Sequence, residues 1–347
     1  METTYYIIFW LVYISVITAA VLMLRLIRTS GWQRILIINV TVFFAFLGFV
    51  FLAAEGFFIF FYDTTDTYGF VRTSTRWEHR YVRLNALGFR DNADYADNTP
   101  ADAYRIGIIG DSFTFGQGIN NVQNRYTDIL QTLLTNKFHR PVVIYNLSRL
   151  GWDTNDHLDV SQRLLPSLHL NLVILAYNMN DIRDLTPQKM NIRNLYRLRP
   201  QWTYSIGHYS LFLDFIFVHL FLDRAITENG YKRLADAYAD KSIWRFQAQR
   251  LRSLIRTLKN QKTPLFTIIF PMLGEDWSDY SLEKAHHQVQ GLFQEEGIKT
   301  LDLLPFYDQY KHTSLWINRF DTHPNEQAQA IAAKQMFLAW FADGLPQ

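Results

Sequence analysis

Two segments far apart in the chain contain the residue types that acyl-transfer chemistry requires. Ser112 follows Gly110 and Asp111 directly after an apolar run, in a turn that can present its hydroxyl group at the edge of a sheet. His323 lies two residues after Asp321, just before the last apolar periodic segment. A histidine can take the proton of a serine hydroxyl, and a carboxylate can hold the imidazole in the required tautomer. These types predict Ser112 as nucleophile, His323 as base and Asp321 as the acid that orients the base.

Two further segments supply groups suited to an oxyanion. Gly151 closes the segment Asn146-Leu147-Ser148-Arg149-Leu150-Gly151, and a glycine lets the backbone approach a ligand and offer its N–H. Asn180, in Asn178-Met179-Asn180-Asp181, can direct a side-chain amide at developing negative charge. Each segment also has an ordinary interpretation as a strand-to-helix turn, a helix N-cap or a loop with a surface histidine. Their joint occurrence, each beside a predicted strand or helix, favours an active site.

In this order the four segments resemble the blocks of the SGNH (GDSL-type) serine hydrolase family. The resemblance covers about residues 104–342. It implies Ser112 as nucleophile and His323 as base. It also implies an oxyanion hole made of the Ser112 N–H, the Gly151 N–H and the Asn180 side chain.

The chain departs from the family pattern at two positions. Asn178 stands where the family usually has glycine, which leaves Asn180 in place. The last block reads Asp-x-His rather than Asp-x-x-His, and Phe320 occupies the position of the usual aspartate. A similar Asp-x-His pair occurs in the alginate O-acetylation branch, so Asp321 is retained as the third triad member. Residues 85–91 also resemble a segment common ahead of the first block in membrane-linked relatives.

The elements that must position these residues alternate between strands and helices. Such alternation predicts a parallel sheet covered on both faces, with ligands at the carboxyl ends of the strands. The expected fold class is α/β, an SGNH-like (flavodoxin-like) three-layer α/β/α parallel sheet. The predicted strands are 105–109, 142–147, 170–177, 264–270 and 298–304, and the predicted helices are 126–134, 153–165, 282–293 and 325–341.

The N-terminal part of the chain contains two long apolar segments. Tyr5–Leu24 and Ile35–Ala54 each provide 20 residues without a formal charge, which is the length that spans a bilayer as a helix. A cleaved signal peptide is the alternative for the first, but its apolar run is too long and no Lys or Arg precedes it. Arg25, Arg28 and Arg34 lie between the two segments. The positive-inside rule places that loop in the cytoplasm and everything after about residue 62 outside.

Two other apolar features are open to more than one interpretation. Glu55 follows the second apolar segment near its outer end, and we expect a solvated carboxylate at the membrane interface. Leu211–Leu222 is too short to span, so a core or lid helix is favoured over a helix on the membrane surface. The expected organisation is a transmembrane anchor at 1–62, a connector and entry segment at 63–103, and a hydrolase-like domain at 104–347 with a helical insertion at about 183–260.

Composition excludes several other classes of function. A net charge of +2 without a Lys/Arg run gives no electrostatic basis for binding nucleic acid. The absence of cysteine excludes disulfides, thiolate catalysis and Cys-ligated zinc. His286 and His287 are adjacent in a predicted helix and point in different directions, so they form a poor metal pair. No cofactor or metal is implied.

The expected function is therefore ester hydrolysis, or transfer of the acyl (acetyl) group to another hydroxyl, through an acyl-enzyme. The resemblance points to an acylated envelope glycan or lipid-linked glycan as substrate, with lipase or thioesterase activity as alternatives. It also makes a multi-pass membrane acyltransferase a plausible partner. The expected location is the inner membrane of a bacterium, with the catalytic domain facing the periplasm or the outside. The competing class is a non-catalytic glycan-binding or assembly module with the same fold.

Overall fold

The computed structural model describes residues 2–26, 31–92, 94–95, 99–186, 199–227 and 230–346. Arg28 and part of the expected insertion, 187–198 and 228–229, lie outside the described residues. The chain divides into two units. One, the N-terminal-helix unit, comprises Met1–Thr64, Gly69–Arg80 and Arg193–Ala225. The other, the sheet unit, comprises Thr65–Tyr68, Tyr81–Ile192 and Ile226–Gln347.

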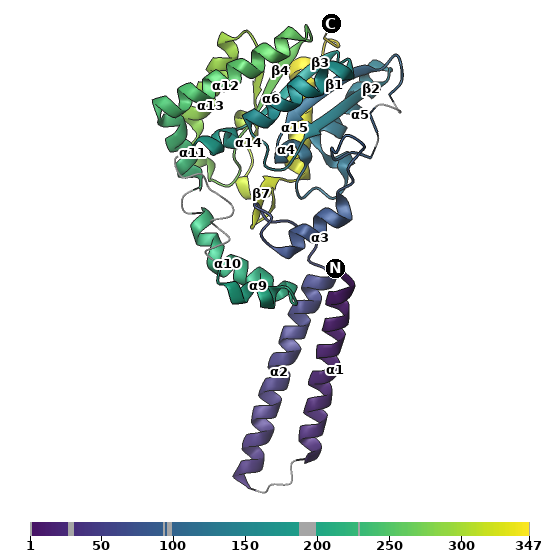
Figure 1. Cartoon of the computed structure of the whole chain (residues 1–347), viewed down its shortest axis with the longest axis vertical. Coiled ribbons are helices and arrows are strands. Elements are labelled where there is room, and N and C mark those ends of the chain that lie inside the picture. Colours follow the sequence, from purple (N-terminus) through teal and green to yellow (C-terminus); the bar gives the residue numbers. More distant parts are fainter. Residues whose placement is uncertain are drawn as a thin grey trace. The chain divides into compact units, whose positions relative to one another are not determined.

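The sheet unit is built on five parallel strands in the order β2-β1-β3-β4-β5 (Figure 1). The three strands at the centre of this order consist almost entirely of buried apolar residues, as expected where helices cover both faces of a parallel sheet. The strands are β1 Tyr104–Gly110, β2 Val142–Ser148, β3 Leu172–Asn178, β4 Leu265–Phe270 and β5 Lys299–Asp302.

Helices form a layer on each face of this sheet. Buried residues of α6 (Thr154–Arg163), α12 (Lys241–Asn260) and α13 (Glu283–Glu295) join one core cluster. Those of α5 (Tyr126–Phe138) and α15 (Glu326–Trp340) join the cluster on the opposite face. The predicted three-layer α/β/α fold is therefore confirmed.

The shorter elements of the sheet unit lie at strand ends and between the main helices. The 3₁₀ helices are labelled η. These elements are α4 Ser112–Phe115, η1 Val122–Asn124, α7 Leu165–Leu168, η2 Met179–Leu185, α11 Gly230–Ala239, η3 Trp277–Asp279, α14 Leu304–Tyr307 and η4 His312–Ser314, with strands β6 Trp316–Asn318 and β7 Asp321–Pro324.

The β6–β7 pair lies just before the last helix, where the sequence analysis predicted no strand. Strand β7 pairs with β6 in an antiparallel two-stranded sheet, with Asn318 opposite Asp321. The short pairing satisfies backbone groups that a buried loop would leave without partners. It also gives the segment that contains Asp321 and His323 the alternating side-chain directions of a strand.

The N-terminal-helix unit contains two helices long and apolar enough to cross a membrane. Tyr6–Met23 within α1 (Glu2–Leu26) and Trp32–Phe60, the whole of α2, qualify by length and composition. A β-carbon at Gly48 would lie 3.2 Å from Val16 Cγ1, so a glycine permits the close approach of the two helices. Both helices are candidate membrane spans. The unit also contains α3 Arg72–Tyr81, α9 Gln201–Gly207 and α10 Leu211–Thr227.

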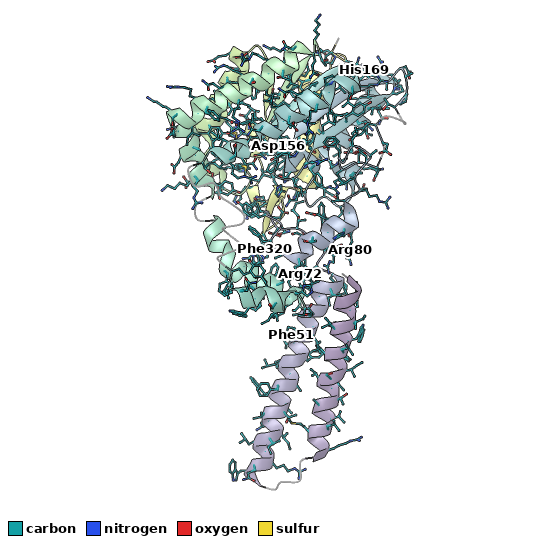
Figure 2. All side chains as sticks on the ribbon, in the orientation of Figure 1. Phe51, Arg72, Arg80, Asp156, His169 and Phe320 are labelled. Atoms are coloured by element: carbon teal, nitrogen blue, oxygen red, sulfur yellow. The ribbon has the colours of Figure 1, made fainter. Side chains whose placement is uncertain are left out.

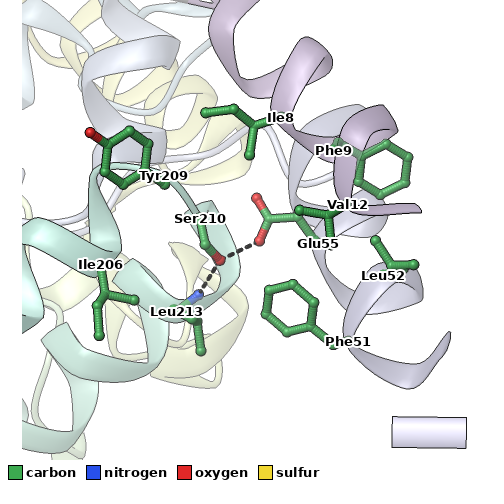
Figure 3. A pocket seen from close by; sticks show the side chains of 10 residues that line it. All are labelled: Ile8, Phe9, Val12, Phe51, Leu52, Glu55, Ile206, Tyr209, Ser210 and Leu213. Atoms are coloured by element: carbon green, nitrogen blue, oxygen red, sulfur yellow. Dashed lines mark hydrogen bonds between the residues drawn. The ribbon is translucent and has the colours of Figure 1, made fainter. Parts of the chain in front are cut away.

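Glu55 is buried rather than solvated, contrary to the expectation from its position in the sequence. Its carboxylate is 4% exposed and accepts hydrogen bonds from Ser210 Oγ (2.5 Å), Leu211 N (2.9 Å) and Phe212 N (3.1 Å). A carboxylate is stabilising at a helix N-terminus, and here it caps α10. Figure 3 shows this contact on the wall of an apolar cavity of about 280 Å³.

Candidate active site

The turn after β1 places Ser112 at the carboxyl edge of the sheet. Asp111 is the N-cap of the short helix α4, and its Oδ1 accepts a hydrogen bond from the Phe113 N–H at 2.9 Å. A β-carbon at Gly110 would lie 2.1 Å from Thr114 Oγ1, so the tight turn needs a glycine there. Ser112 is the first residue of α4, where backbone N–H groups have no helical partner.

Residues 85–91 support the nucleophile turn. Arg90 is 1% exposed and donates hydrogen bonds from Nη1 to the Gly116 carbonyl and from Nη2 to the Ile119 carbonyl, both at 2.6 Å. Burial lowers the pKa of Arg90 to about 9. The guanidinium group thus holds the backbone at the end of α4.

The structure brings Ser112, His323 and Asp321 into one hydrogen-bonded line. Ser112 Oγ lies 2.8 Å from His323 Nε2, and His323 Nδ1 lies 2.6 Å from Asp321 Oδ1. All three side chains are buried, with Asp321 completely inaccessible. Because the imidazole bonds the hydroxyl through one nitrogen and the carboxylate through the other, proton transfer from Ser112 to His323 is geometrically prepared.

Strand geometry explains how the Asp-x-His spacing works. Residues i and i+2 of a strand point to the same side, so the side chains of Asp321 and His323 in β7 lie together. The His323 N–H also donates to Asp321 Oδ1 at 3.0 Å. Phe320, labelled in Figure 2, precedes this strand, and its carbonyl accepts from Thr67 N at 3.0 Å. Asp321 within β7 is therefore the acid beside His323, and the backbone carbonyl of Phe320, the preceding residue, is hydrogen-bonded to Thr67.

Thr65 completes the contacts of the acid and was missed by the sequence analysis. Its hydroxyl donates to Asp321 Oδ2, the carboxylate oxygen that does not face His323. The same segment is tied to β7 by a hydrogen bond from Thr322 N to Thr67 Oγ1 at 3.1 Å. Thr65 lies 256 residues from Asp321 in the chain, and nothing about an isolated threonine identifies such a contact in advance.

The predicted oxyanion residues follow strands that neighbour one another. Gly151 comes shortly after β2 and Asn180 directly after β3, and both strands pair with β1. Gly151 has φ +72°, a left-handed conformation that favours glycine. Asn180 is half-buried, and its amide lies beside the carboxyl group of Asp111. Asn180 therefore lies beside the turn that carries Ser112, and Gly151 follows the strand on the other side of β1.

Asn178, the first departure from the family pattern, fits its position. Its φ is −108°, so no glycine is needed there. Its side chain accepts from the Asn180 N–H at 3.3 Å, and the Asp181 side chain accepts from the Asn178 N–H at 3.3 Å. This reciprocal capping fixes the turn that presents Asn180.

Two further acids and a histidine are buried behind the site. Burial raises the pKa of Asp111, while the Phe113 N–H and the positive charges nearby act against that rise. Burial and the charge of Asp111 raise the pKa of Asp181 well above its ordinary value. Burial lowers the pKa of His157 to about 3, and its Nδ1 lies 3.8 Å from Asp181 Oδ2. This histidine is therefore neutral at physiological pH and is no candidate for a base.

Within the described part of the chain, no group of three or more His, Cys, Asp or Glu residues could hold a metal ion. His286 instead bonds Asp302 through Nδ1 at 2.9 Å and the Tyr280 hydroxyl through Nε2 at 3.1 Å. Its ring therefore fixes the start of α13 against β5.

A three-layer α/β/α fold with a hydrogen-bonded serine, histidine and aspartate at the carboxyl edge of its parallel sheet is typical of a class of serine ester hydrolases. The model of the GDSL-like Lipase/Acylhydrolase family matches residues 108–331, which is more than half of the chain. The chain therefore belongs to this family, whose members are esterases and lipases, and is a hydrolase of the esterase type.

Solved structures with a similar chain path include several lipolytic proteins and esterases. The lipase Lip_vut3 from a goat rumen metagenome is 10% identical, with a TM-score of 0.47, covering 70% of this chain and 99% of its own. A variant of Axe2, an acetyl xylan esterase from Geobacillus stearothermophilus, is 14% identical, with a TM-score of 0.44, covering 68% and 94%. A member of the lipolytic G-D-S-L family from Veillonella parvula is 14% identical, with a TM-score of 0.40, covering 67% and 96%. No curated protein matches the chain.

Proposed function

We propose that Ser112, His323 and Asp321 are the catalytic triad of an acyl-transfer enzyme. The observation that supports this most is the continuous line of hydrogen bonds from Ser112 Oγ through the His323 ring to Asp321. In the first step, Ser112 Oγ attacks the ester carbonyl while His323 Nε2 takes its proton. His323 then gives that proton to the leaving alcohol, which produces an acyl-enzyme.

The oxyanion of each tetrahedral intermediate is stabilised by the Ser112 N–H, the Gly151 N–H and the Asn180 amide. Support comes from the position of these groups after three neighbouring strands and from the left-handed conformation of Gly151. Donors held rigidly at this point lower the barrier because they need no reorganisation as charge develops. Water, or a hydroxyl group of a second sugar, then resolves the acyl-enzyme.

The substrate we propose is an O-acylated, most simply O-acetylated, envelope glycan or lipid-linked glycan. Two candidate membrane spans at the N-terminus support an enzyme tethered to the inner membrane. Arg25 closely follows the first candidate span, and Arg34 lies in the first turn of the second. Both arginines are thus at the ends joined by the short connection, which supports a sheet unit facing the periplasm. The Asp-x-His pair, similar to that of the alginate O-acetylation branch, supports transfer to a glycan and a multi-pass acyltransferase as partner.

Labelling of the full chain in detergent with a fluorophosphonate probe tests the triad. An activated serine reacts covalently, so the wild-type chain should be labelled and Ser112→Ala should not. Labelling of both at equal rates would refute Ser112 as nucleophile. No labelling of a folded wild-type chain would favour the non-catalytic module.

Two further measurements test the finer parts of the proposal. Acetylated oligosaccharides, p-nitrophenyl acetate and long-chain acyl esters should be compared as substrates, with a sugar acceptor added in half of the reactions. A preference for long-chain acyl esters would favour lipase or thioesterase activity. Formation of an acetylated sugar acceptor would identify a transferase. Reporter fusions should be active outside the cytoplasm when placed after residue 62 and inside when placed at Arg34. The reverse pattern would contradict the proposed orientation.

A further inference from the structure

One side of α9 is both apolar and exposed. Trp202, Ile206 and Tyr209 are spaced four and three residues apart, so they lie on one face of α9 and of the turn that follows it. All three side chains are exposed, Trp202 by 55% and Tyr209 by 57%. An exposed apolar surface of this kind on a folded protein indicates contact with an apolar partner.

Helix α10 continues the same surface. Leu213, Ile216 and Leu220 follow one another at intervals of three and four residues, which places them on one face of the helix. Leu220 is 67% exposed, and the ring of Phe217 beside it lies 5.2 Å from that of Trp202 on α9. The two helices therefore present one apolar surface. We call it the α9–α10 face, and it consists of Trp202, Ile206, Tyr209, Leu213, Ile216 and Leu220.

Another side of α10 packs on α2, one of the two candidate membrane spans. The Phe58 ring of α2 lies 5.8 Å from that of Phe212 and 4.8 Å from that of Phe215. The Glu55 carboxylate of α2 accepts from Leu211 N and Phe212 N in the first turn of α10. Helix α10 is therefore apolar both where it meets α2 and where it is exposed. This pattern is typical of a helix that is buried in a protein or in a membrane.

The single formal charge among the described residues 201–221 is turned away from the α9–α10 face. Asp214 is buried and forms an ion pair with Arg199 Nη2 at 2.8 Å. Its second carboxylate oxygen accepts a hydrogen bond from Arg72 N at 2.8 Å. Moving a charged group into lipid is costly, and the α9–α10 face would enter lipid without that cost.

The hydrogen bonds to Glu55 fix the position of the α9–α10 face along α2. Glu55 is five residues before Phe60, the last residue of α2, which corresponds to about 7.5 Å along the helix. Helices that lie in a bilayer interface bury their apolar side by about 5–10 Å. Figure 3 shows Ile206 and Leu213 on the wall of the apolar cavity that Phe51 of α2 also lines. The α9–α10 face is therefore continuous with the apolar surface of a candidate span, near the end of that span.

We propose that the α9–α10 face is embedded in the lipid leaflet at the C-terminal end of α2, where it contacts acyl chains. Tryptophan and tyrosine favour this boundary because each ring has an apolar body and a polar N–H or O–H, as Trp202 and Tyr209 do. Helices α9 and α10 then form a third membrane contact, one that does not cross the bilayer. This assigns Leu211–Leu222 to the membrane surface, the alternative to a core or lid helix. The inference rests on the membrane tether of the proposed function and not on its chemistry.

Spin labels at single cysteines test this contact, because the chain contains no cysteine of its own. Full-length Leu220→Cys and Ile206→Cys should be labelled and reconstituted in vesicles of equal parts phosphatidylethanolamine and phosphatidylglycerol. Leu338→Cys, at an exposed leucine of α15, is the matched aqueous control, and Phe49→Cys, at an exposed position of α2, is the control for a span. Each label is characterised by the ratio of its collision rates with oxygen and with a nickel chelate. Since hydrocarbon excludes the polar chelate, this ratio should be about tenfold higher at Leu220 and Ile206 than at Leu338.

A ratio at Leu220 and Ile206 equal to that at Leu338 would overturn the proposal, because the α9–α10 face would then be in water. Low collision rates with both reagents would also overturn it, since they would show that protein covers the labels. The label at Phe49 separates these failures from a failure of the tether. If Phe49 is in hydrocarbon and Leu220 is not, this inference alone fails, whereas Phe49 in water would overturn the tether as well. Labels in lipid at all three positions support the inference even if Ser112→Ala is as active as the wild type.

Discussion

Glu55 in the N-terminal-helix unit and Asp321 in the sheet unit are both buried carboxylates, with 4% and 0% of their surface exposed. Each is satisfied by several hydrogen-bond donors, as buried charges must be. Glu55 accepts from one hydroxyl and two backbone N–H groups at the start of α10. Asp321 accepts from the Thr65 hydroxyl, the His323 N–H and the His323 ring.

The two carboxylates differ in the groups to which their hydrogen-bond donors are themselves bonded. The donors to Glu55 are two backbone N–H groups and the hydroxyl of Ser210. Among the described residues, that hydroxyl accepts a hydrogen bond only from Leu213 N, in the same first turn of α10, so no titratable group is connected to Glu55 through it. The partner of Asp321 is a histidine whose other nitrogen reaches Ser112. Burial and hydrogen bonding alone therefore do not identify a functional acid. A functional acid is identified by the titratable and nucleophilic side chains that are hydrogen-bonded to it in series.

Removing the base should have the largest effect. His323→Ala leaves Ser112 without a proton acceptor, so we expect kcat/KM on p-nitrophenyl acetate to fall by about 10³-fold or more, as for Ser112→Ala. Folding should be retained, which circular dichroism checks. The double variant should be no worse than either single one, because the two residues act as a unit. A loss below roughly tenfold for His323→Ala would remove the proposed mechanism.

Asp321→Asn should be nearly as damaging. The amide can donate to the ring and so favours the wrong imidazole tautomer, and we expect a loss of about 10²- to 10⁴-fold in kcat. KM should change little, since Asp321 is proposed to act through His323 rather than on the substrate. Steady-state kinetics on the same ester decide the matter. A loss of less than roughly tenfold would show that another group orients the ring.

The sequence predicted most of this arrangement because each block is local. Ser112, Gly151 and Asn180 follow strands that are clear apolar runs in the sequence, and the parallel topology brings the ends of these strands to one edge. The strand geometry of Asp321 and His323 was less visible. Seven residues in two short strands give little hydrophobic alternation, and the pairing with β6 depends on the fold around it.

Contacts between distant segments could not be predicted at all. Thr65 is a single polar residue without a motif, and its role depends on the carboxylate that the fold brings near it. Glu55 was misjudged for the same reason. The position of Glu55 along α2 could be predicted from the sequence. Its burial could not, because it depends on Ser210, 155 residues later, and on the start of α10 that follows Ser210.

Removing the hydroxyl of Thr65, which bonds Asp321, should reduce activity less than replacing Asp321 itself. Thr65→Val keeps the shape but removes the donor to Asp321 Oδ2, so we expect kcat to fall by about 5- to 100-fold with KM little changed. Thr65→Ser should restore most of the activity, because it returns the hydroxyl. Thr132→Val, an exposed threonine on α5, is the control and should leave kcat unchanged. A valine variant as active as the wild type, or a serine variant as impaired as valine, would exclude a positioning role.

Glu55→Gln should have the smallest effect on catalysis and act on stability instead. The carboxylate uses both oxygens to accept three hydrogen bonds, and the amide of glutamine can supply only one acceptor oxygen. Its NH₂ group would then face donors of α10, so we expect the free energy of unfolding to fall by about 1–3 kcal/mol. Thermal unfolding of the full chain in detergent measures this, while kcat on p-nitrophenyl acetate should stay within about twofold by the same reasoning. Glu295→Gln, an exposed acid paired with Arg252, should change neither quantity appreciably, since exposed ion pairs contribute little. If Glu55→Gln instead lowered kcat as strongly as Asp321→Asn without loss of stability, the distinction between a structural and a chemical carboxylate would fail in this protein.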